Sequence, residues 1–346
     1  MRKDYDVVVV GAGNAALCAA IASKENGASV LVLEKGPKHK RGGNSFFTDG
    51  AIRFSFEGLD DLREIIPQMT DEEAEKVVMP AYTKSDYYND LMKATNNQSR
   101  QDLANYLVEN SYETIKWMHE NKIDFDLIYD NQSFYKNGKY HFWGGLPVKV
   151  DGRGVGLIQK LNDRAQELGI DVWYESPATK IVKNEQGEVT SVVVNKAGEE
   201  IVVDTKAIVL ASGSFEANKE WRTENMGDEW ENAIVRGTEY NTGDGIKMAI
   251  DVGAQPYGQW SMGHSIGTDA NAPRVGDFTK PGDIFKKHSY PLGIIVNKNG
   301  KRFVDEGADF RNYTYAKYGR AVLEQPGNIA YQIYDGKVRP KLRSEY

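Results

Sequence analysis

Two features near the N-terminus carry the clearest chemical signature: a glycine turn at residues 11–16 and the acid Glu34. The turn follows four consecutive valines. Gly11 allows a sharp reversal there, and Gly13 lets the backbone approach a pyrophosphate closely. Ala16 stands where a third glycine often lies, and the backbone N–H groups of the helix that begins here face the phosphates. Glu34 ends the next strand about 20 residues later, where a carboxylate accepts hydrogen bonds from ribose hydroxyls. The pattern predicts a dinucleotide site and favours FAD or NAD over NADP.

Two further glycine-rich segments could add contacts to the same ligand. Residues 35–45 form a basic loop in which a glycine pair leaves room for a cofactor, while Asn44 and Ser45 supply hydrogen-bond donors. A solvated loop is the alternative interpretation. Residues 237–245 place two glycines around Asp244 at the start of a helix. Taken alone, this second segment is an ordinary helix-capping turn.

The composition excludes several other chemistries. The chain has 346 residues, a formal net charge of −7 and one cysteine, Cys18, so we expect no nucleic-acid surface, internal disulfide or cysteine metal cluster. The five histidines show no metal-ligand spacing, and no metal is predicted. No apolar run approaches the roughly 18 residues of a membrane span. The first strand begins almost at the N-terminus, which leaves no room for a signal peptide. A cytoplasmic protein is expected.

The hydrophobic pattern predicts an α/β fold, with a Rossmann-like dinucleotide-binding domain that carries a β-meander. Parallel strands are expected at residues 6–10, 30–33, 171–175 and 207–213, a helix at 15–26, and the meander at 178–183, 189–195 and 200–203. Ligands bind at the carboxyl ends of parallel strands. We therefore expect Gly11, Glu34 and Gly213 to gather at one edge of the sheet.

The remaining segments form an insertion and a second domain. Residues 56–121 are expected to be mostly helical, with Leu103 and Leu107 among the side chains that face inward. After about residue 257 long loops carry isolated polar groups, and a strand, a helix and a strand follow at 292–297, 313–323 and 329–334. The expected division is a cofactor domain over 1–257 and a smaller α+β domain over 258–346.

Three stretches complete a recognisable set of motifs. They are Arg41-Gly42-Gly43-Asn44-Ser45, Thr242-Gly243-Asp244-Gly245, and Asn297-Lys298-Asn299-Gly300-Lys301-Arg302-Phe303-Val304-Asp305-Glu306. With the glycine turn, Glu34 and Ala211-Ser212-Gly213-Ser214, they run along most of the chain. The sequence resembles the flavoprotein family of fumarate reductases and succinate dehydrogenases, and within it the soluble branch that includes tricarballylate dehydrogenase. The third stretch is the most specific, whereas many flavoenzymes share the glycine turn.

The resemblance implies an FAD-dependent oxidoreductase that acts on a carbon–carbon bond of a small di- or tricarboxylate. Tricarballylate-like dehydrogenation or fumarate reduction is implied, with a hydride exchanged with flavin N5. Arg311 matches the arginine that exchanges the proton; pairing only with Asp309 or with a substrate carboxylate is its alternative role. The resemblance assigns Thr242, His264 and Glu306 to the substrate, gives His288 weaker support, and leaves Arg302 to brace the fold. The implied cofactor contacts come from Gly11, Gly13, Asn14, Ala15, Ala16, Glu34, Lys35, Gly42, Gly43, Asn44, Ser45, Gly50, Ala178, Ala211, Ser212, Gly213, Gly243 and Asp244.

Two departures from the family pattern qualify this reading. Membrane-bound members attach FAD through a histidine in the second flavin loop, where this chain has Asn44, so non-covalent FAD is expected. Family members also continue beyond a segment equivalent to residue 346, so the capping domain is expected to be incomplete. A non-catalytic N-terminal fragment and a 3-ketosteroid dehydrogenase-like enzyme stay open as alternatives. Because haem motifs and iron–sulfur cysteines are missing from the sequence, a separate protein or carrier is expected to exchange the electrons.

Overall fold

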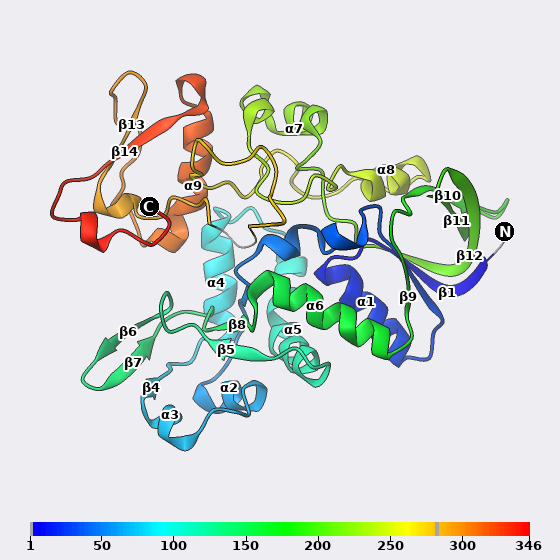
Figure 1. Ribbon diagram of the computed structural model, residues 1–346, viewed down its shortest axis with the longest axis horizontal. Coiled ribbons are helices and arrows are strands. Elements are labelled where there is room, and N and C mark those ends of the chain that lie inside the picture. Colours follow the sequence, from blue (N-terminus) through cyan, green and yellow to red (C-terminus); the bar gives the residue numbers. More distant parts are fainter. Residues whose placement is uncertain (1–2, 281–283) are drawn as a thin grey trace.

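The computed structural model describes residues 3–280 and 284–346 and combines helices and strands in a mixed α/β architecture (Figure 1). The helices are α1 (Asn14–Glu25), α2 (Leu59–Ile65), α3 (Asp71–Glu75), α4 (Lys84–Ala94), α5 (Gln101–Glu120), α6 (Arg153–Glu167), α7 (Lys219–Met226), α8 (Asp244–Asp251) and α9 (Arg311–Leu323). The strands are β1 (Lys3–Val10), β2 (Val30–Leu33), β3 (Ala51–Ile52), β4 (Val77–Val78), β5 (Phe125–Leu127), β6 (Ser133–Lys136), β7 (Lys139–Phe142), β8 (Val148–Val150), β9 (Asp171–Trp173), β10 (Ala178–Lys183), β11 (Val189–Lys196), β12 (Glu199–Leu210), β13 (Ile294–Asn297) and β14 (Ala330–Ile333).

The central sheet has six strands in the order β10-β11-β12-β1-β2-β9. Strands β12, β1, β2 and β9 are parallel neighbours, and β10, β11 and β12 form the antiparallel meander. The α/β prediction and the meander are confirmed. The prediction of two separate strands at residues 200–203 and 207–213 is wrong, because residues 199–210 form one continuous strand, β12. Its first half pairs with β11 and its second half with β1, so the polar pair Thr205-Lys206 does not interrupt it.

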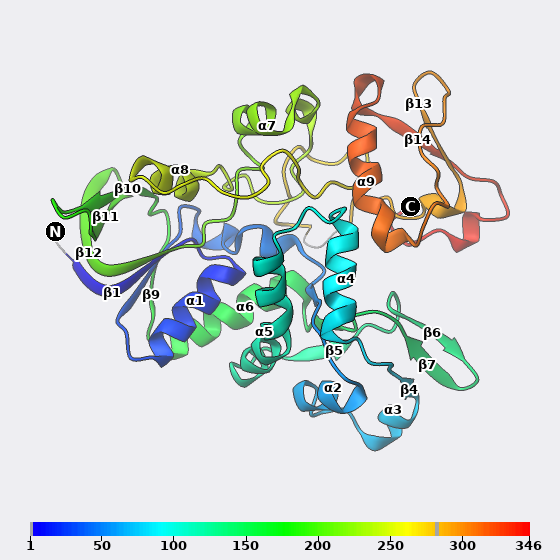
Figure 2. The same ribbon diagram turned by 180° about the vertical axis from the view of Figure 1, so that it is seen from behind.

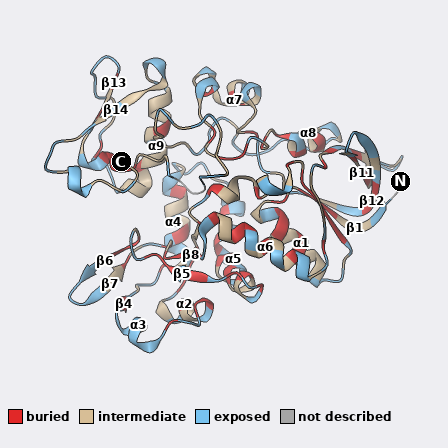
Figure 3. Ribbon diagram, viewed as in Figure 1, coloured by how far each residue is buried: buried red, intermediate tan, exposed pale blue. Residues whose placement is uncertain are grey.

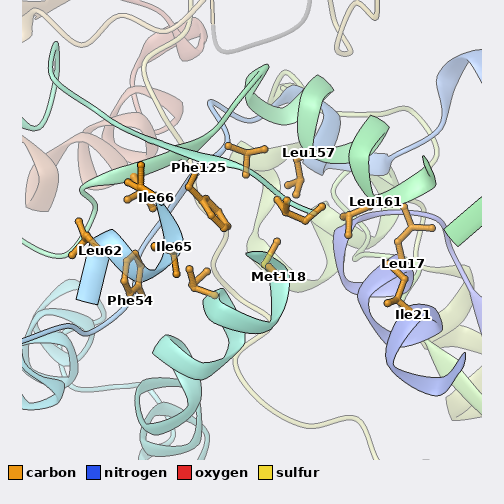
Figure 4. Close-up of a cluster of buried hydrophobic side chains, with 14 of the residues drawn as sticks. Leu17, Ile21, Phe54, Leu62, Ile65, Ile66, Met118, Phe125, Leu157 and Leu161 are labelled. Atoms are coloured by element: carbon orange, nitrogen blue, oxygen red, sulfur yellow. The ribbon is translucent and has the colours of Figure 1, made fainter. Parts of the chain in front are cut away.

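The side chains of the four valines of β1 pack on both faces of this sheet. Val9 packs in a cluster with residues of α1 and α6, while Val8 and Val10 pack in a second cluster with the meander strands and Met248 of α8. Side chains alternate between faces along a strand, and a parallel strand covered on both faces is apolar throughout. In Figure 4, Leu17 and Ile21 of α1 lie beside Leu157 and Leu161 of α6.

The helical insertion packs on the continuation of the same cluster. Phe54, Leu62 and Ile65 are buried there (Figure 4). The prediction that Leu103 and Leu107 of α5 face inward is wrong, because they are 62% and 49% exposed. The buried stripe of α5 instead consists of Ala104, Val108, Ser111, Ile115 and Met118. These residues follow the three- and four-residue spacing of one helix face.

The C-terminal part is a smaller assembly around α9. Strands β13 and β14 form an antiparallel pair, and both ribbon views place α9 next to α4 (Figures 1 and 2). The Tyr313 hydroxyl donates to Asp90 Oδ1 of α4 at 2.6 Å. Among the described residues, Tyr290 and Ile295 are the buried hydrophobic residues beyond position 257, and Figure 3 shows burial concentrated around the central sheet and its helices. The domain boundary near residue 257 stays a prediction.

Every helix in residues 3–280 and 284–346 is too short or too polar to span a bilayer.

Candidate functional site

The glycine turn is held between the ends of two strands. The Gly11 N–H donates to the Leu33 carbonyl at 2.7 Å, and a Cβ at position 11 would lie 2.5 Å from the Ala211 carbonyl oxygen. Gly11 also has a φ of +109°, a backbone region that favours glycine. β1, β2 and β12 therefore bring their carboxyl ends to one edge, as expected for a parallel sheet.

Glu34 lies against this turn. Its two carboxylate oxygens accept hydrogen bonds from the backbone N–H groups of Ala12, at 3.1 Å, and Gly36, at 2.7 Å. The side chain is buried, and burial raises its pKa. A carboxylate oxygen can accept more than one hydrogen bond. The geometry therefore leaves Glu34 able to accept the ribose hydroxyls of a dinucleotide.

The second glycine loop contacts the start of α1. The Asn14 N–H donates to Ser45 Oγ at 3.3 Å. Gly42 has a φ of +101°, and a Cβ there would meet the Ile158 side chain at 2.7 Å. The positive φ and this close approach both require glycine at position 42. The predicted loop is thus placed beside the glycine turn.

The segment before α8 lies at the same edge. The Lys35 ammonium forms an ion pair with Asp244 and donates to Thr242 Oγ1 at 2.5 Å. A Cβ at Gly213 would meet the Asn241 side chain at 2.7 Å. The structure thus brings together segments that stand far apart in the sequence. Thr242, which the resemblance assigns to the substrate, faces Lys35 and Asp244.

Two predicted cofactor residues lie away from these contacts. Gly50 packs against the backbone of Arg153 at the start of α6, where a Cβ would approach within 2.7 Å. Ala178 begins β10 and is buried in the cluster that includes Leu33. Their cofactor roles stay predictions.

The chemistry of the edge fits FAD. The start of α1 has Gly13 at its N-cap and no acidic residue in its first turn, so its positive end is free to face a phosphate. Glu34 offers the acceptor for a ribose, and the second loop borders the same helix start. A diphosphate beside α1 and a ribose beside Glu34 are neighbouring parts of an adenosine diphosphate group.

A cavity of about 1200 Å³ opens between the second loop and the C-terminal part. Asn44, Phe47 and Glu216 line it on the side of the second glycine loop, and His264 and His288 line it on the other side. Polar groups from distant segments therefore converge on one space. A large, partly apolar cavity with a few converging polar groups is the usual form of a small-molecule site.

The two histidines of the cavity have distinct partners. His264 Nε2 lies 2.9 Å from the Tyr315 hydroxyl, and burial lowers its pKa, with a smaller contribution from Arg236. His288 Nδ1 lies 3.3 Å from Arg311 Nη1. Burial, followed by the positive charge of Arg311, lowers the pKa of His288 to about 3. Both imidazoles are therefore neutral near pH 7.

Arg311 lies behind His288, on the side away from the cavity. It begins α9, and the described residues that line the cavity include His288 but not Arg311. Burial, and then the neighbouring Arg343, lower its pKa. Asp309, the carboxylate considered as its partner, forms an ion pair with Lys93 at 3.0 Å. Arg311 thus reaches the cavity through His288.

Glu306 is engaged within the protein. One carboxylate oxygen accepts the Ile295 N–H, and the other forms an ion pair with Arg302. The Arg302 charge, together with hydrogen bonds, offsets the effect of burial and lowers the pKa of Glu306. This contact ties the turn after β13 to the strand itself, and the substrate role of Glu306 stays a prediction.

The cavity residues that sequence reasoning missed include Glu216, Trp230 and Tyr315. Glu216 follows the predicted return turn by three residues, so its position next to a carboxyl end could have identified it. Trp230 and Tyr315 gave no comparable signal, because aromatic side chains are usually core residues.

The comparisons with known proteins agree with this geometry. Residues 6–341 match the model of the family described as FAD binding domain. The chain belongs to this family. It is 28% identical over 347 residues to a vinyl phenol reductase of Lactiplantibacillus plantarum, which covers 99% of this chain and 64% of that protein. It is also 28% identical to an NADH:fumarate oxidoreductase of Klebsiella pneumoniae, over 98% of this chain and 33% of that protein.

Solved structures show the same fold. A flavocytochrome c3 fumarate reductase in an open conformation matches with a TM-score of 0.70 and 26% identity, over 98% of this chain and 54% of that chain. This member of the FAD binding domain family thus spans between a third and two thirds of the length of the relatives named above. The predicted family resemblance is confirmed at the level of fumarate reductases and related flavoproteins.

The low pKa of His288 predicts an acid-sensitive stability. The folded protein keeps this imidazole neutral, whereas an unfolded histidine binds a proton below about pH 6.5. Stability linked to His288 is therefore present above pH 6.5 and is lost as the pH falls towards 3, by up to about 1.4 kcal/mol per pH unit. In urea unfolding between pH 7 and 4.5, we expect a His288→Gln variant to lose less free energy of unfolding than the wild type. His39→Gln, at an exposed position, should keep the wild-type slope; equal slopes in all three proteins would contradict the assignment.

Proposed function

We propose that the protein to which this chain belongs is an FAD-dependent reductase of carbon–carbon double bonds conjugated to a carboxylate. The observation that carries the proposal is the cavity between the second flavin loop and the cluster of His264, His288 and Arg311. The names of relatives support it, because a fumarate oxidoreductase and a urocanate reductase both act on such bonds. The vinyl phenol reductase extends the range to an aromatic alkene.

Different residues of the chain bind the cofactor, bind the substrate and supply the proton in this proposal. FAD, when bound, supplies the hydride. Glu34 and the start of α1 hold its adenosine diphosphate end, with the second loop beside them. On the opposite side of the cavity, His264 and His288 hold a carboxylate by hydrogen bonds. Arg311 is not among the described residues that line the cavity, and it adds the positive charge that stabilises enolate-like charge as the double bond is reduced. As the proposed proton donor it acts through His288, whose Nδ1 lies 3.3 Å from Arg311 Nη1.

Three finer features belong to the same proposal. The sequence resemblance names tricarballylate, which is saturated, so the corresponding substrate for reduction is the enoate derived from it. The FAD is non-covalent, because Asn44 replaces the attaching histidine; yellow colour that remains on acid-precipitated protein would refute this. The electrons come from a separate donor protein or carrier.

A steroid is the second candidate substrate. The cavity is lined by several tyrosines, including Tyr290, Tyr315 and Tyr318, and its volume of about 1200 Å³ can hold a large apolar ligand. A 3-oxosteroid 1-dehydrogenase of Mycolicibacterium smegmatis is 24% identical over 98% of this chain and 69% of that protein. Oxidation of a 3-ketosteroid without any reduction of enoates would favour this alternative.

The reaction is tested by reoxidation of the reduced flavin. The protein is reduced without oxygen and mixed in turn with fumarate, urocanate, acrylate and the enoate derived from tricarballylate, and in a separate experiment the oxidised protein is mixed with a 3-ketosteroid. Recovery of the oxidised flavin spectrum with an enoate supports the proposal. A chain that retains no flavin at all would support the alternative of a non-catalytic fragment.

A further inference from the structure

Helix α9 carries the side chains that contact both histidines of the cavity. Arg311 begins the helix, and its Nη1 lies 3.3 Å from His288 Nδ1. Tyr315 follows one helical turn later, and its hydroxyl lies 2.9 Å from His264 Nε2. Residues four positions apart lie on the same face of a helix. One face of α9 therefore meets both imidazoles.

The segment that carries His264 is docked on the same helix. His264 lies in a loop, outside any helix or strand. The hydroxyl of the next residue, Ser265, donates to the Ala316 carbonyl of α9 at 3.1 Å. A Cβ at Gly319 would collide with the backbone of Ser265 and Ile266, so the helix and the loop are in close backbone contact there. α9 therefore fixes the position of the loop.

The start of α9 is itself anchored to α4. The Tyr313 hydroxyl donates to Asp90 Oδ1 at 2.6 Å, and the Lys93 ammonium lies 4.0 Å from the centre of the Tyr313 ring. Lys93 also forms an ion pair with Asp309 at 3.0 Å. A side chain holds another in one orientation when its own support is rigid. Anchored in this way, α9 is a firm support for Tyr315.

The hydrogen bond between Tyr315 and His264 has a favoured direction. A phenol has one hydrogen to donate, and a neutral imidazole has one donor and one acceptor nitrogen. The hydrogen bonds of residues 3–280 and 284–346 give the Tyr315 hydroxyl one partner, His264 Nε2. If Nε2 carried the proton, the Tyr315 O–H would have no acceptor in this part of the chain, which lowers stability. Donation from Tyr315 to Nε2 avoids this cost and leaves the imidazole proton on Nδ1.

We propose that Tyr315 is a positioning residue that fixes His264 as the Nδ1–H tautomer, so that Nδ1 donates a hydrogen bond to the substrate carboxylate. The hydrogen bond made by one ring nitrogen decides which nitrogen carries the proton. With Nε2 bound to Tyr315, Nδ1 is the nitrogen left for a ligand in the cavity that both residues line. This inference rests on the proposed function, in which His264 holds a carboxylate.

Nitrogen-15 NMR of the histidine side chains reads the tautomer without turnover. The chain has five histidines, so replacing each with glutamine in turn assigns the signals of the purified protein, with whatever FAD it carries. Near neutral pH we expect His264 to carry its proton on Nδ1. Tyr315→Phe keeps the ring, which packs 5.1 Å from His288, and removes the hydroxyl. The Nε2–H form should then appear at His264.

The same variant should raise the pKa of His264. Burial, and then the charge of Arg236, lower this pKa in the wild type. A hydrogen bond to the neutral form of a base lowers its pKa further, so losing the Tyr315 hydroxyl moves the midpoint of the NMR titration upward. Tyr313→Phe is the matched control, because Tyr313 lies on α9 and donates to Asp90. It should change neither the tautomer nor the midpoint.

Two NMR results would overturn the proposal. The first is a wild-type protein in which His264 carries its proton on Nε2, a result that needs no variant to fold. The second is a set of His264 signals that is the same in the wild type and in Tyr315→Phe.

Kinetics with fumarate connect the tautomer to the substrate. With an artificial electron donor that re-reduces the flavin, Tyr315→Phe should raise KM about 10-fold, which is within the range of one hydrogen bond to a charged group, and should change kcat less than about twofold. In a His264→Gln background the same substitution should leave KM unchanged, because residues that act through one contact are not additive. An equal rise of KM in both backgrounds would show that Tyr315 contacts the substrate itself and would refute the positioning role.

The two proposals fail in different ways. An Nδ1–H tautomer that depends on Tyr315, in a protein whose flavin no enoate reoxidises, would support the contact described here and refute the reaction. Reoxidation by enoates in a protein whose His264 carries its proton on Nε2 would support the reaction and refute the role of Tyr315.

Discussion

Replacing Arg311 with methionine is expected to lower kcat for enoate reduction by about 10²- to 10⁴-fold, the range of a lost general acid. The substitution keeps the length and apolar stem of the side chain while it removes the charge and the donor to His288 Nδ1. Both the proton source and the orientation of the imidazole are then lost. Steady-state kinetics with an enoate and an artificial electron donor that re-reduces the flavin measure the effect.

The split between kcat and KM decides which role Arg311 has. A proton donor acts in the transition state, so kcat falls while KM changes little. A residue that only pairs with a substrate carboxylate would raise KM and leave kcat close to the wild-type value. Arg320→Met is the matched control, because Arg320 lies on the same helix and pairs with Glu324 at 3.3 Å. It should change kcat less than twofold, and an equal loss in both variants would show that α9 is merely disturbed.

Replacing Gly11 with alanine is expected to abolish FAD binding and to destabilise the fold. The Cβ would lie 2.5 Å from the Ala211 carbonyl oxygen, and the φ of +109° is unfavourable for any residue with a Cβ. Both partners are backbone directly after the carboxyl ends of β1 and β12, so neither can move without disturbing these strands. We expect a loss of more than about 3 kcal/mol, because the clash adds to a backbone strain of about 1–3 kcal/mol.

The Gly253→Ala variant separates the cost of backbone strain at a positive φ from the cost of a steric clash of the added Cβ. Gly253 has a φ of +96° and no heavy atom within 4 Å of an added Cβ, so this variant carries the backbone strain alone. It should lose about 1–3 kcal/mol and keep its FAD. Urea unfolding and flavin absorbance after gel filtration measure both properties. If Gly11→Ala keeps its flavin and matches Gly253→Ala in stability, the tight turn is not what holds the cofactor.

The parts of the fold that could be predicted from the sequence depend on short-range patterns of residue type and spacing. The strand, turn and helix around Gly11 and the acid Glu34 follow from residues close together in the chain, and their contact is confirmed. The orientation of α5 could not be predicted in the same way. Leu103 and Leu107 lie on one face and Val108 and Ile115 on another, and the packing partners decide which face is buried.

The cavity depends on contacts between distant segments. Glu216 meets Asn44 across 172 positions, and His288 meets Arg311 across 23. No local pattern predicts either pair. The resemblance identified Arg311 and His264 as important, but only the structure shows that His288 stands between Arg311 and the cavity.

The most direct test of the central claim is anaerobic reoxidation of the reduced flavin in a stopped-flow spectrometer. The account predicts that the purified protein carries FAD that is released by acid. It also predicts that an enoate restores the oxidised flavin spectrum in a single exponential phase whose rate falls at least 10²-fold in Arg311→Met. A flavin that stays reduced in the presence of every enoate, while oxygen still reoxidises it, would contradict the account.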